Sequence, residues 1–274
     1  MTEPLLAIDD LSVSYGRGRR RNEVLREVSL AVAPGETLGL VGESGSGKTT
    51  LGRAVLGLVP IAGGHIRFEG EEIGNQRTRA RRRLAKDIQV VFQDPYTSLN
   101  PSMRILDILI EPLIAQGISS KVARQRVGEL LDRVALPSNS LGRYSREFSG
   151  GQRQRIAIAR ALALDPKLIV CDEPVSALDL STQLRVLDLL VEIQERTGVA
   201  YLFISHDLAV VRHISHRVAV MYRGEIVEIG DARQVTEHPD HPYTQRLWAA
   251  NLVADPDAQE RRREARLALV DSQD

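Results

Sequence analysis

The sequence predicts an α/β fold in which a parallel sheet is flanked by helices and carries an inserted helical lobe. Three observations support this prediction. A glycine-rich loop stands between a strand-like run and a helix-like run within residues 37–56. Two later apolar runs, of the kind that forms strands buried on both faces, end in polar residues at 88–93 and 168–173. Between those runs, residues from about 94 to 148 change to helical spacing, which indicates the inserted lobe.

Composition places the chain among globular proteins. It has 274 residues, of which 43% are hydrophobic and 26% charged, enough for one large domain with a lobe or tail. Lys plus Arg equals Asp plus Glu at 36 each, so there is no general attraction to nucleic acid, although a local basic patch is not excluded. Cys171 is the only cysteine, which excludes intrachain disulfides and multi-cysteine metal sites and fits an intracellular location.

No membrane or export signal is expected. Residues 1–4 show no basic region followed by an apolar core, so no secretory signal is visible. The most apolar long window, Ile105 to Ala115, is too short to span a bilayer and is interrupted by charged residues and a proline. We expect any membrane role to act through a partner.

The chain begins with two predicted strands, Leu5 to Tyr15 and Val24 to Val32. The basic turn between them, residues 16–22, is expected to be a solvated loop, with contact to a phosphate or to acidic lipid headgroups as the alternative. Tyr15 ends the first strand. Its residue type alone favours packing at the sheet edge, and a platform for an adenine ring is the alternative.

The stretch Gly42 to Thr49 fits G-x-x-x-x-G-K-[ST], the phosphate-binding P-loop pattern, between a predicted strand at 37–41 and a predicted helix at 50–56. Glycines let the backbone N–H groups turn inward, and the helix adds its positive N-terminal end. Lys48 can then reach the β- and γ-phosphates, and the Thr49 hydroxyl can bind Mg²⁺. The expected nucleotide contacts are Gly42, Glu43, Ser44, Gly45, Ser46, Gly47, Lys48, Thr49 and Thr50.

The segments after the P-loop place another polar side chain, that of Gln93, at the same edge of the sheet. His65 to Glu69 is a predicted strand, and the arginine-rich segment 77–86 is expected to be a solvated helix face, with nucleic-acid binding as a minor alternative. The apolar strand 88–92 delivers Gln93 at its carboxyl end. Ligands of open α/β sheets lie outside the carboxyl ends of the strands, so Gln93 is placed to meet the phosphate.

The helical lobe is predicted from residues 105–115 and 121–134 and leads into a helix at 153–164. Just before that helix stand Ser149, Gly150, Gly151 and Gln152. Small residues at a helix start make an anion site of its N-terminus, although the same residues also form ordinary helix starts.

The apolar run 168–171 ends in Asp172 and Glu173. Two adjacent carboxylates at the end of a buried strand destabilise the fold unless they bind a cation, so they are expected to have a cation or a catalytic role. Asp172 suits Mg²⁺, directly or through water, and Glu173 suits polarising the water that attacks the γ-phosphate. The alternative is a strand end that simply enters solvent.

The remaining segments extend the sheet and end in a tail. A helix at 181–196 and a strand at 200–204 deliver His206 to the same edge, which favours γ-phosphate sensing over a structural role for this histidine. Residues 218–222 and 225–229 indicate a hairpin. A short aromatic-bearing helix at 243–250 precedes a charged tail at 259–266 that is expected to be helical or disordered.

Taken in order, these motifs resemble the ATP-binding subunit of an ABC transporter over most of the chain. The resemblance implies a RecA-like P-loop NTPase core with an N-terminal antiparallel β subdomain and an inserted α-helical subdomain. It also implies adenine stacking by Tyr15, a Mg²⁺ site at Thr49, Gln93 and Asp172, and catalysis of ATP hydrolysis by Lys48, Gln93, Glu173 and His206. The signature segment would be Ser149, Gly150, Gly151 and Gln152, acting on a partner's ATP, and Asp179 would lie in the D-loop. Phe148 stands where the family usually has leucine, and no loss of function is expected because both are apolar.

Finer features are similar to the dipeptide, oligopeptide and nickel importer branch: residues 91–101, 173–179 and 241–245. This implies a nucleotide-binding domain at 1–235, with the helical subdomain at about 94–148, and a C-terminal extension of the peptide-importer type at 236–274. Some members of the branch hold an iron–sulfur site in a cysteine-bearing extension, which a chain with Cys171 alone cannot do.

The resemblance further implies an assembly at the cytoplasmic face of the membrane. The chain would pair with a second, homologous ATP-binding subunit as a heterodimer, bind two transmembrane permease subunits, and serve an extracytoplasmic substrate-binding protein. A nickel importer of the same branch is one alternative, and an exporter component is another. A soluble ABC-type ATPase acting on nucleic acid or ribosomes is disfavoured, because the chain shows neither sustained heptads nor an internal repeat.

Overall fold

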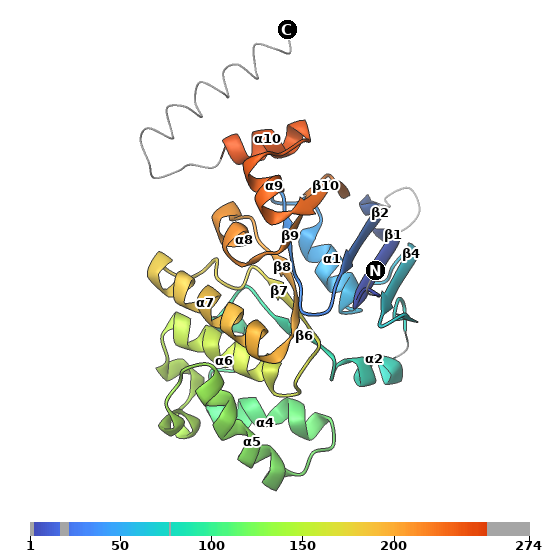
Figure 1. Ribbon diagram of the computed structural model, residues 1–274. Coiled ribbons are helices and arrows are strands. Elements are labelled where there is room, and N and C mark those ends of the chain that lie inside the picture. The colour runs from blue at the N-terminus through green and yellow to red at the C-terminus, as the bar shows by residue number, and fades with distance from the viewer. Residues whose placement is uncertain (1–2, 17–21, 77, 251–274) are drawn as a thin grey trace.

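The computed structural model describes residues 3–16, 22–76 and 78–250 (Figure 1). Its centre is a six-stranded sheet in the order β10-β9-β3-β8-β7-β6. The strands are β3 (Thr37–Val41), β6 (Ile88–Val91), β7 (Leu168–Asp172), β8 (Ala200–Ile204), β9 (Arg217–Tyr222) and β10 (Glu225–Asp231). Only the β9–β10 hairpin, expected from the sequence, is antiparallel; the other pairs are parallel. The carboxyl ends of β3, β6, β7 and β8 therefore share one edge, which we call the nucleotide edge.

Both faces of this sheet are buried, which explains the continuous apolar runs. In β7, Leu168 and Val170 belong to one hydrophobic cluster, while Ile169 and Cys171 belong to the other. Successive side chains of a strand point to opposite faces, so a strand covered on both sides must be apolar throughout. Cys171 is fully buried, and burial raises the pKa of its thiol, so it is an inert core residue.

A second, antiparallel sheet covers one face, in the order β2-β1-β4-β5. It is formed by β1 (Leu6–Tyr15), β2 (Asn22–Val32), β4 (Gly63–Phe68) and β5 (Glu71–Glu72). With helix α1 (Lys48–Val55) it packs on the central sheet through residues such as Leu51 and Ile66. The basic turn expected at 16–22 lies largely outside the described residues, because 17–21 are not among them.

Helices form the region between β6 and β7. They are α3 (Pro95–Ser98), α4 (Ile105–Ala115), α5 (Ser120–Arg133), the 3₁₀ helices η2 (Ser138–Gly142) and η3 (Ser145–Glu147), and α6 (Gly150–Leu162). In Figure 1, α4 and α5 lie at the bottom of the molecule, below α6. Leu109, Leu130 and Ile156 join these helices to the cluster on the sheet's other face. Helix α4 continues through Pro112 and ends at Ala115.

The remaining helices are α2 (Thr78–Leu84), α7 (Leu180–Thr197), α8 (Leu208–Ile214), α9 (Ala232–Glu237) and α10 (Pro242–Ala249). Helices α9 and α10 lie at the opposite end of the molecule from α4 and α5 (Figure 1). In the described part of the chain, no helix has the length and apolar character needed to cross a membrane. The charged tail predicted at 259–266 falls outside the described residues.

Candidate nucleotide site

The glycine loop between β3 and α1 depends on two glycines with positive φ. Gly42 has φ +151°, and a side chain there would place a Cβ only 2.1 Å from the carbonyl oxygen of Met221. Gly47 has φ +113°, and a Cβ there would meet the Leu25 side chain at 2.8 Å. Only glycine fits both the conformation and the space. Helix α1 consequently begins at Lys48, two residues before the predicted start.

Lys48 is buried inside this loop, with 6% of its surface exposed. Its Nζ donates to the carbonyl oxygens of Gly42 and Glu43, both at 2.8 Å. Burial lowers the pKa of Lys48, and the nearby charges of Glu173 and Asp172 oppose that shift. A desolvated ammonium held by backbone carbonyls interacts strongly with an anion, so the loop is suited to a phosphate.

Thr49 and Asp172 meet across the end of the sheet, where the Thr49 hydroxyl donates to Asp172 Oδ1 over 3.1 Å. Burial raises the pKa of Asp172, while this hydrogen bond acts in the opposite direction. Both residues line a cavity of about 520 Å³, together with the exposed Gln93. The three side chains predicted to hold Mg²⁺ thus face one space.

These donors fit a magnesium ion. Hydroxyl, carboxylate and amide oxygens are hard ligands, and Mg²⁺ usually completes its shell with water and substrate phosphates. In the described ranges, no group of three or more His, Cys, Asp or Glu side chains could hold a metal by itself. A cation at Thr49 and Asp172 would complete its shell with water and with oxygens of a bound phosphate.

Glu173 and His206 pair at the ends of neighbouring strands, with Oε1 and Nδ1 3.1 Å apart. The Glu173 backbone is in the left-handed region, at φ +48°, and its N–H donates to Ile204 O over 2.9 Å. A non-glycine residue held in this region is strained, and such strain is common at functional sites. The carboxylate predicted to polarise water and the predicted sensor histidine are thus in direct contact.

Ser149 and Gln152 form a capping box at the start of α6. The Ser149 hydroxyl accepts from the Gln152 N–H at 3.4 Å, and Gln152 Oε1 accepts from the Ser149 N–H at 3.0 Å. The helix therefore begins at Gly150, and the predicted start at Arg153 was wrong. Glycine has a low helix propensity, which disfavours a helix start at Gly150 and Gly151. The two hydrogen bonds of the capping box, to the N–H groups of Ser149 and Gln152, stabilise the start in spite of this.

Three predicted site features make no described hydrogen bond with the loop. In the described part of the chain, no hydrogen bond joins residues 149–152 to residues 42–49. Tyr15, 41% exposed at the end of β1, makes no described ring contact or hydrogen bond with the loop. Asp179 caps helix α7, and hydrogen bonds from Thr182 and Ser181 lower the pKa of its carboxyl to about 2.

One contact of the loop was not predicted. The backbone N–H of Glu43 donates to the Tyr243 hydroxyl over 3.1 Å, linking the loop to α10. Tyr243 is 3% exposed, and its ring lies 4.1 Å from that of Tyr222. The two residues of the hydrogen bond are 200 positions apart, and no local pattern in the sequence connects them.

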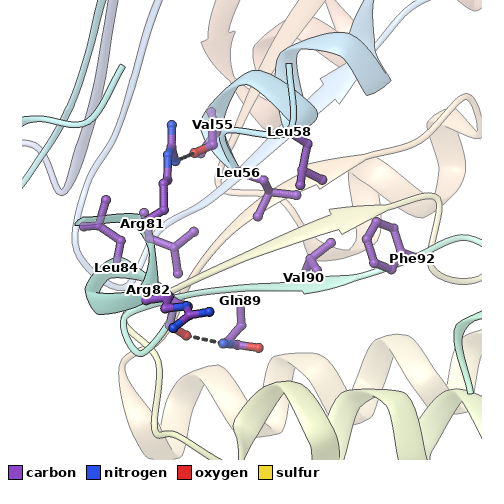
Figure 2. A pocket seen from close by; sticks show the side chains of 11 residues that line it. Val55, Leu56, Leu58, Arg81, Arg82, Leu84, Gln89, Val90 and Phe92 are labelled. Carbon is purple, nitrogen blue, oxygen red and sulfur yellow. Dashed lines mark hydrogen bonds between the residues drawn. The ribbon is translucent and has the colours of Figure 1, made fainter. Parts of the chain in front are cut away.

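A groove of about 390 Å³ opens between the end of α1, helix α2 and strand β6 (Figure 2). Its apolar lining includes Leu58 and Phe92, which are 60% and 37% exposed. Arg81 closes one side, where its guanidinium donates to the carbonyl oxygens of Val55 and Ile73 at 3.0 and 2.8 Å. Exposed large apolar side chains in a groove are typical of interaction surfaces.

Comparison with family models matches residues 25–176, more than half of the chain, to a model described as ABC transporter. The chain belongs to the ABC transporter family. This match contains the loop at 42–49, the segment 149–152 and the acidic pair at 172–173. The predicted family is therefore confirmed.

Among curated ABC relatives, the glutathione import ATP-binding protein GsiA of Escherichia coli (strain K12) is 53% identical over 277 aligned residues. The protein of the same name from Pectobacterium atrosepticum is 48% identical. Each alignment covers 98% of this chain but 44% of the relative. The chain thus spans less than half the length of these relatives.

Two solved ABC structures share the fold. The ATP-binding cassette MJ0796, a dimer in a post-hydrolysis state bound to ADP and Pi, has a TM-score of 0.74 and 28% identity, covering 83% of this chain and 99% of its own. The cbiO1 protein of Clostridium perfringens, part of the ABC transporter complex cbiONQ, has a TM-score of 0.78 and 25% identity, covering 92% and 96%. The predicted P-loop NTPase fold is confirmed.

Proposed function

We propose that this chain binds and hydrolyses ATP to power the import of a di- or oligopeptide. The observation that carries hydrolysis is the contact between Glu173 and His206, 3.1 Å apart, beside the Thr49–Asp172 pair. The observation that supports peptide import is the 53% identity to proteins named for glutathione import, because glutathione is itself a short peptide.

The roles follow from position and charge. Lys48 binds the β- and γ-phosphates, and its bonds to the Gly42 and Glu43 carbonyl oxygens hold the ammonium at the place where these phosphates arrive. Glu173 orients the attacking water and accepts its proton, and His206 fixes the Glu173 carboxylate in that orientation. Phosphoryl transfer depends mainly on positioning and charge stabilisation, and these contacts are this chain's own share of both.

Thr49 and Asp172 hold Mg²⁺ in this proposal, with Gln93 lining the same cavity. The ion supplies charge neutralisation for the phosphate oxygens. Burial raises the pKa of Asp172, which means that the charged carboxylate is poorly solvated. A cation next to this carboxylate would offset the lost solvation.

A second nucleotide-binding subunit completes the site. Ser149, Gly150 and Gly151 lie at a helix start whose N-terminal end favours an anion, yet they have no described bond with this chain's own loop. The related cassette MJ0796 is described as a dimer. We propose a head-to-tail pair with a different, homologous subunit, and a purified transporter with only two copies of this chain would contradict it.

Two permease subunits complete the proposed transporter at the cytoplasmic face of the membrane. The groove in Figure 2 suits a short permease helix with an apolar face, because Leu58 and Phe92 offer exposed apolar surface there. Phe92 directly precedes Gln93, which lines the cavity beside Thr49. A permease helix bound in this groove would therefore contact Phe92, the residue directly before Gln93 in the chain.

The test measures uptake in a strain of the source organism that lacks this chain. Complementation with the wild-type chain should restore uptake of radiolabelled glutathione or of a labelled dipeptide, whereas Glu173→Gln should not. Purified Glu173→Gln should bind ATP with unchanged affinity but hydrolyse it at least about 100-fold more slowly, the usual contribution of a general base. Near wild-type turnover of Glu173→Gln would remove Glu173 as the base.

Two further measurements identify the transported substrate and test the groove as the permease contact. Uptake of ⁶³Ni²⁺, in place of peptides, would move the chain to nickel import, and no loss of uptake in the deletion strain would overturn import altogether. Leu58→Asp should abolish uptake without changing the ATP affinity of the purified chain, because Leu58 lies on the surface and not at the loop. Normal uptake by Leu58→Asp would exclude the groove as the permease contact.

A further inference from the structure

The peptide unit between Gly42 and Glu43 is bonded at both of its polar ends. Its carbonyl oxygen, Gly42 O, accepts from Lys48 Nζ at 2.8 Å. Its N–H, that of Glu43, donates to the Tyr243 hydroxyl at 3.1 Å. A planar peptide cannot turn one end without the other, so the Tyr243 hydroxyl fixes the direction in which the Gly42 carbonyl faces Lys48.

Tyr243 is itself rigidly placed. It is 3% exposed, and its ring packs on that of Tyr222. The start of α10 is tied to β10 through the Glu228 carboxylate, which accepts from the N–H groups of Asp240 and His241 at 2.9 and 3.1 Å. His241 then caps the helix by accepting from the Tyr243 N–H. The hydroxyl thus comes from a braced element and not from a loose terminus.

The loop has a second anchor on the same side. The N–H of Gly224, in the β9–β10 turn, donates to Ser46 O over 2.9 Å. This anchor acts in the middle of the loop and comes from the central sheet. The Tyr243 contact acts at the first peptide of the loop and comes from residues that follow the sheet.

We propose that Tyr243 is a positioning residue for ATP binding, which acts on Lys48 through the Gly42–Glu43 peptide. The segment Pro239–Ala249 is then a working part of the phosphate site. Lys48 retains two carbonyl partners while Tyr243 holds this peptide, and the ammonium stays directed at the place where β- and γ-phosphates bind. Without the hydroxyl, the Glu43 N–H loses this partner, and the peptide is free to rotate.

The test rests on the proposed ATP binding and uses the full chain. Tyr243→Phe removes the hydroxyl and keeps the ring stack, and Tyr222→Phe is its matched control, since within the described part of the chain the Tyr222 hydroxyl has no hydrogen bond. Affinities for ATP and for AMP are measured by competition with a fluorescent ATP analogue. AMP lacks the two phosphates that Lys48 reaches, so it reports on the rest of the site.

Tyr243→Phe should lower the affinity for ATP about 3- to 10-fold, the range expected for one neutral hydrogen bond, and leave the affinity for AMP unchanged. Tyr222→Phe should change neither. The melting temperature serves as the folding control, and binding is measured at a temperature where circular dichroism shows all variants folded. An unchanged ratio of ATP to AMP affinity in Tyr243→Phe would overturn the proposal, whether or not both affinities fall. A wild-type chain that does not bind ATP would instead overturn the proposed function.

Discussion

The two halves of the nucleotide machinery are built in opposite ways. In the phosphate-loop half, the key side chains are held by distant residues: Thr49 by Asp172, and Glu173 by His206. In the signature half, the described hydrogen bonds of Ser149 and Gln152 stay within four residues. The first half is thus organised by the tertiary structure of this chain, whereas the second is organised locally at a helix start and, in the proposed function, acts on another molecule. Breaking each half should therefore give different kinetic signatures.

Lys48→Ala should give the largest effect, because it removes the only buried ammonium of the loop and both of its carbonyl bonds. Charge-assisted hydrogen bonds to two phosphates are worth several kcal/mol, so the dissociation constant for ATP should rise at least about 100-fold, and hydrolysis should be lost with it. Isothermal titration calorimetry checks the affinity. Lys121→Ala, at an exposed position of α5, is the control and should bind ATP normally.

Gly151→Ala should separate the two halves. A Cβ at this position would lie 2.2 Å from Thr182 Cγ2, so the start of α6 must shift against α7. ATP binding by the purified chain should change less than about twofold, while turnover of the assembled transporter should fall about 10- to 100-fold, because the defect lies in stabilising a partner's phosphate.

Gly128→Ala makes the same substitution in α5, where a Cβ meets no atom within 4 Å, and should leave turnover unchanged. Equal losses of ATP affinity and turnover in Gly151→Ala would mean that this segment belongs to the chain's own loop. The contrast between the two halves would then be wrong.

Asp172→Asn tests the stability of the phosphate-loop half, and its effect on the melting temperature is the smallest shift to be measured. Burial raises the pKa of Asp172 above its ordinary value of 3.8, so this group contributes stability below that value and loses it as pH rises through the raised pKa. At pH 7 the charged Asp172 carboxylate therefore lowers the stability of the folded state. Asparagine should therefore raise the melting temperature at pH 7, although hydrolysis is lost.

The gain should disappear below about pH 4, where the aspartate is itself protonated. Asp132→Asn, at an exposed position of α5, should leave the melting temperature unchanged at both pH values. A lower melting temperature for Asp172→Asn at pH 7 would show that the Thr49 bond and neighbouring cations outweigh the burial.

The fold was predictable where burial dictates the sequence. Strand β8 matches its predicted range, Ala200 to Ile204, because a strand covered on both faces has no polar residue inside it. Short elements were missed, among them α8 (Leu208–Ile214), since seven residues are too few to show a helical period. Helix α6 begins at Gly150 and not at the predicted Arg153, because the capping box of Ser149 and Gln152 stabilises a helix start whose two glycines have low helix propensity.

The site was predictable where chain order and strand direction combine. Parallel strands bring their carboxyl ends to one edge, so the sequence alone predicts that Gln93, Glu173 and His206 follow strands that end there. Contacts that depend on how a later helix docks could not. Tyr243 carries no local signal of its hydrogen bond to Glu43, because that bond arises only from the packing of α10.

The Glu43–Tyr243 bond also places the completion of the phosphate loop late in biosynthesis. The two residues are 200 positions apart, so at ribosomal speeds of about 5–20 residues per second Tyr243 is made about 10–40 s after Glu43. During that interval the nascent chain carries its phosphate-binding glycines and lysine without one of their anchors. The loop can therefore form its hydrogen bond to Tyr243 only after translation has reached α10.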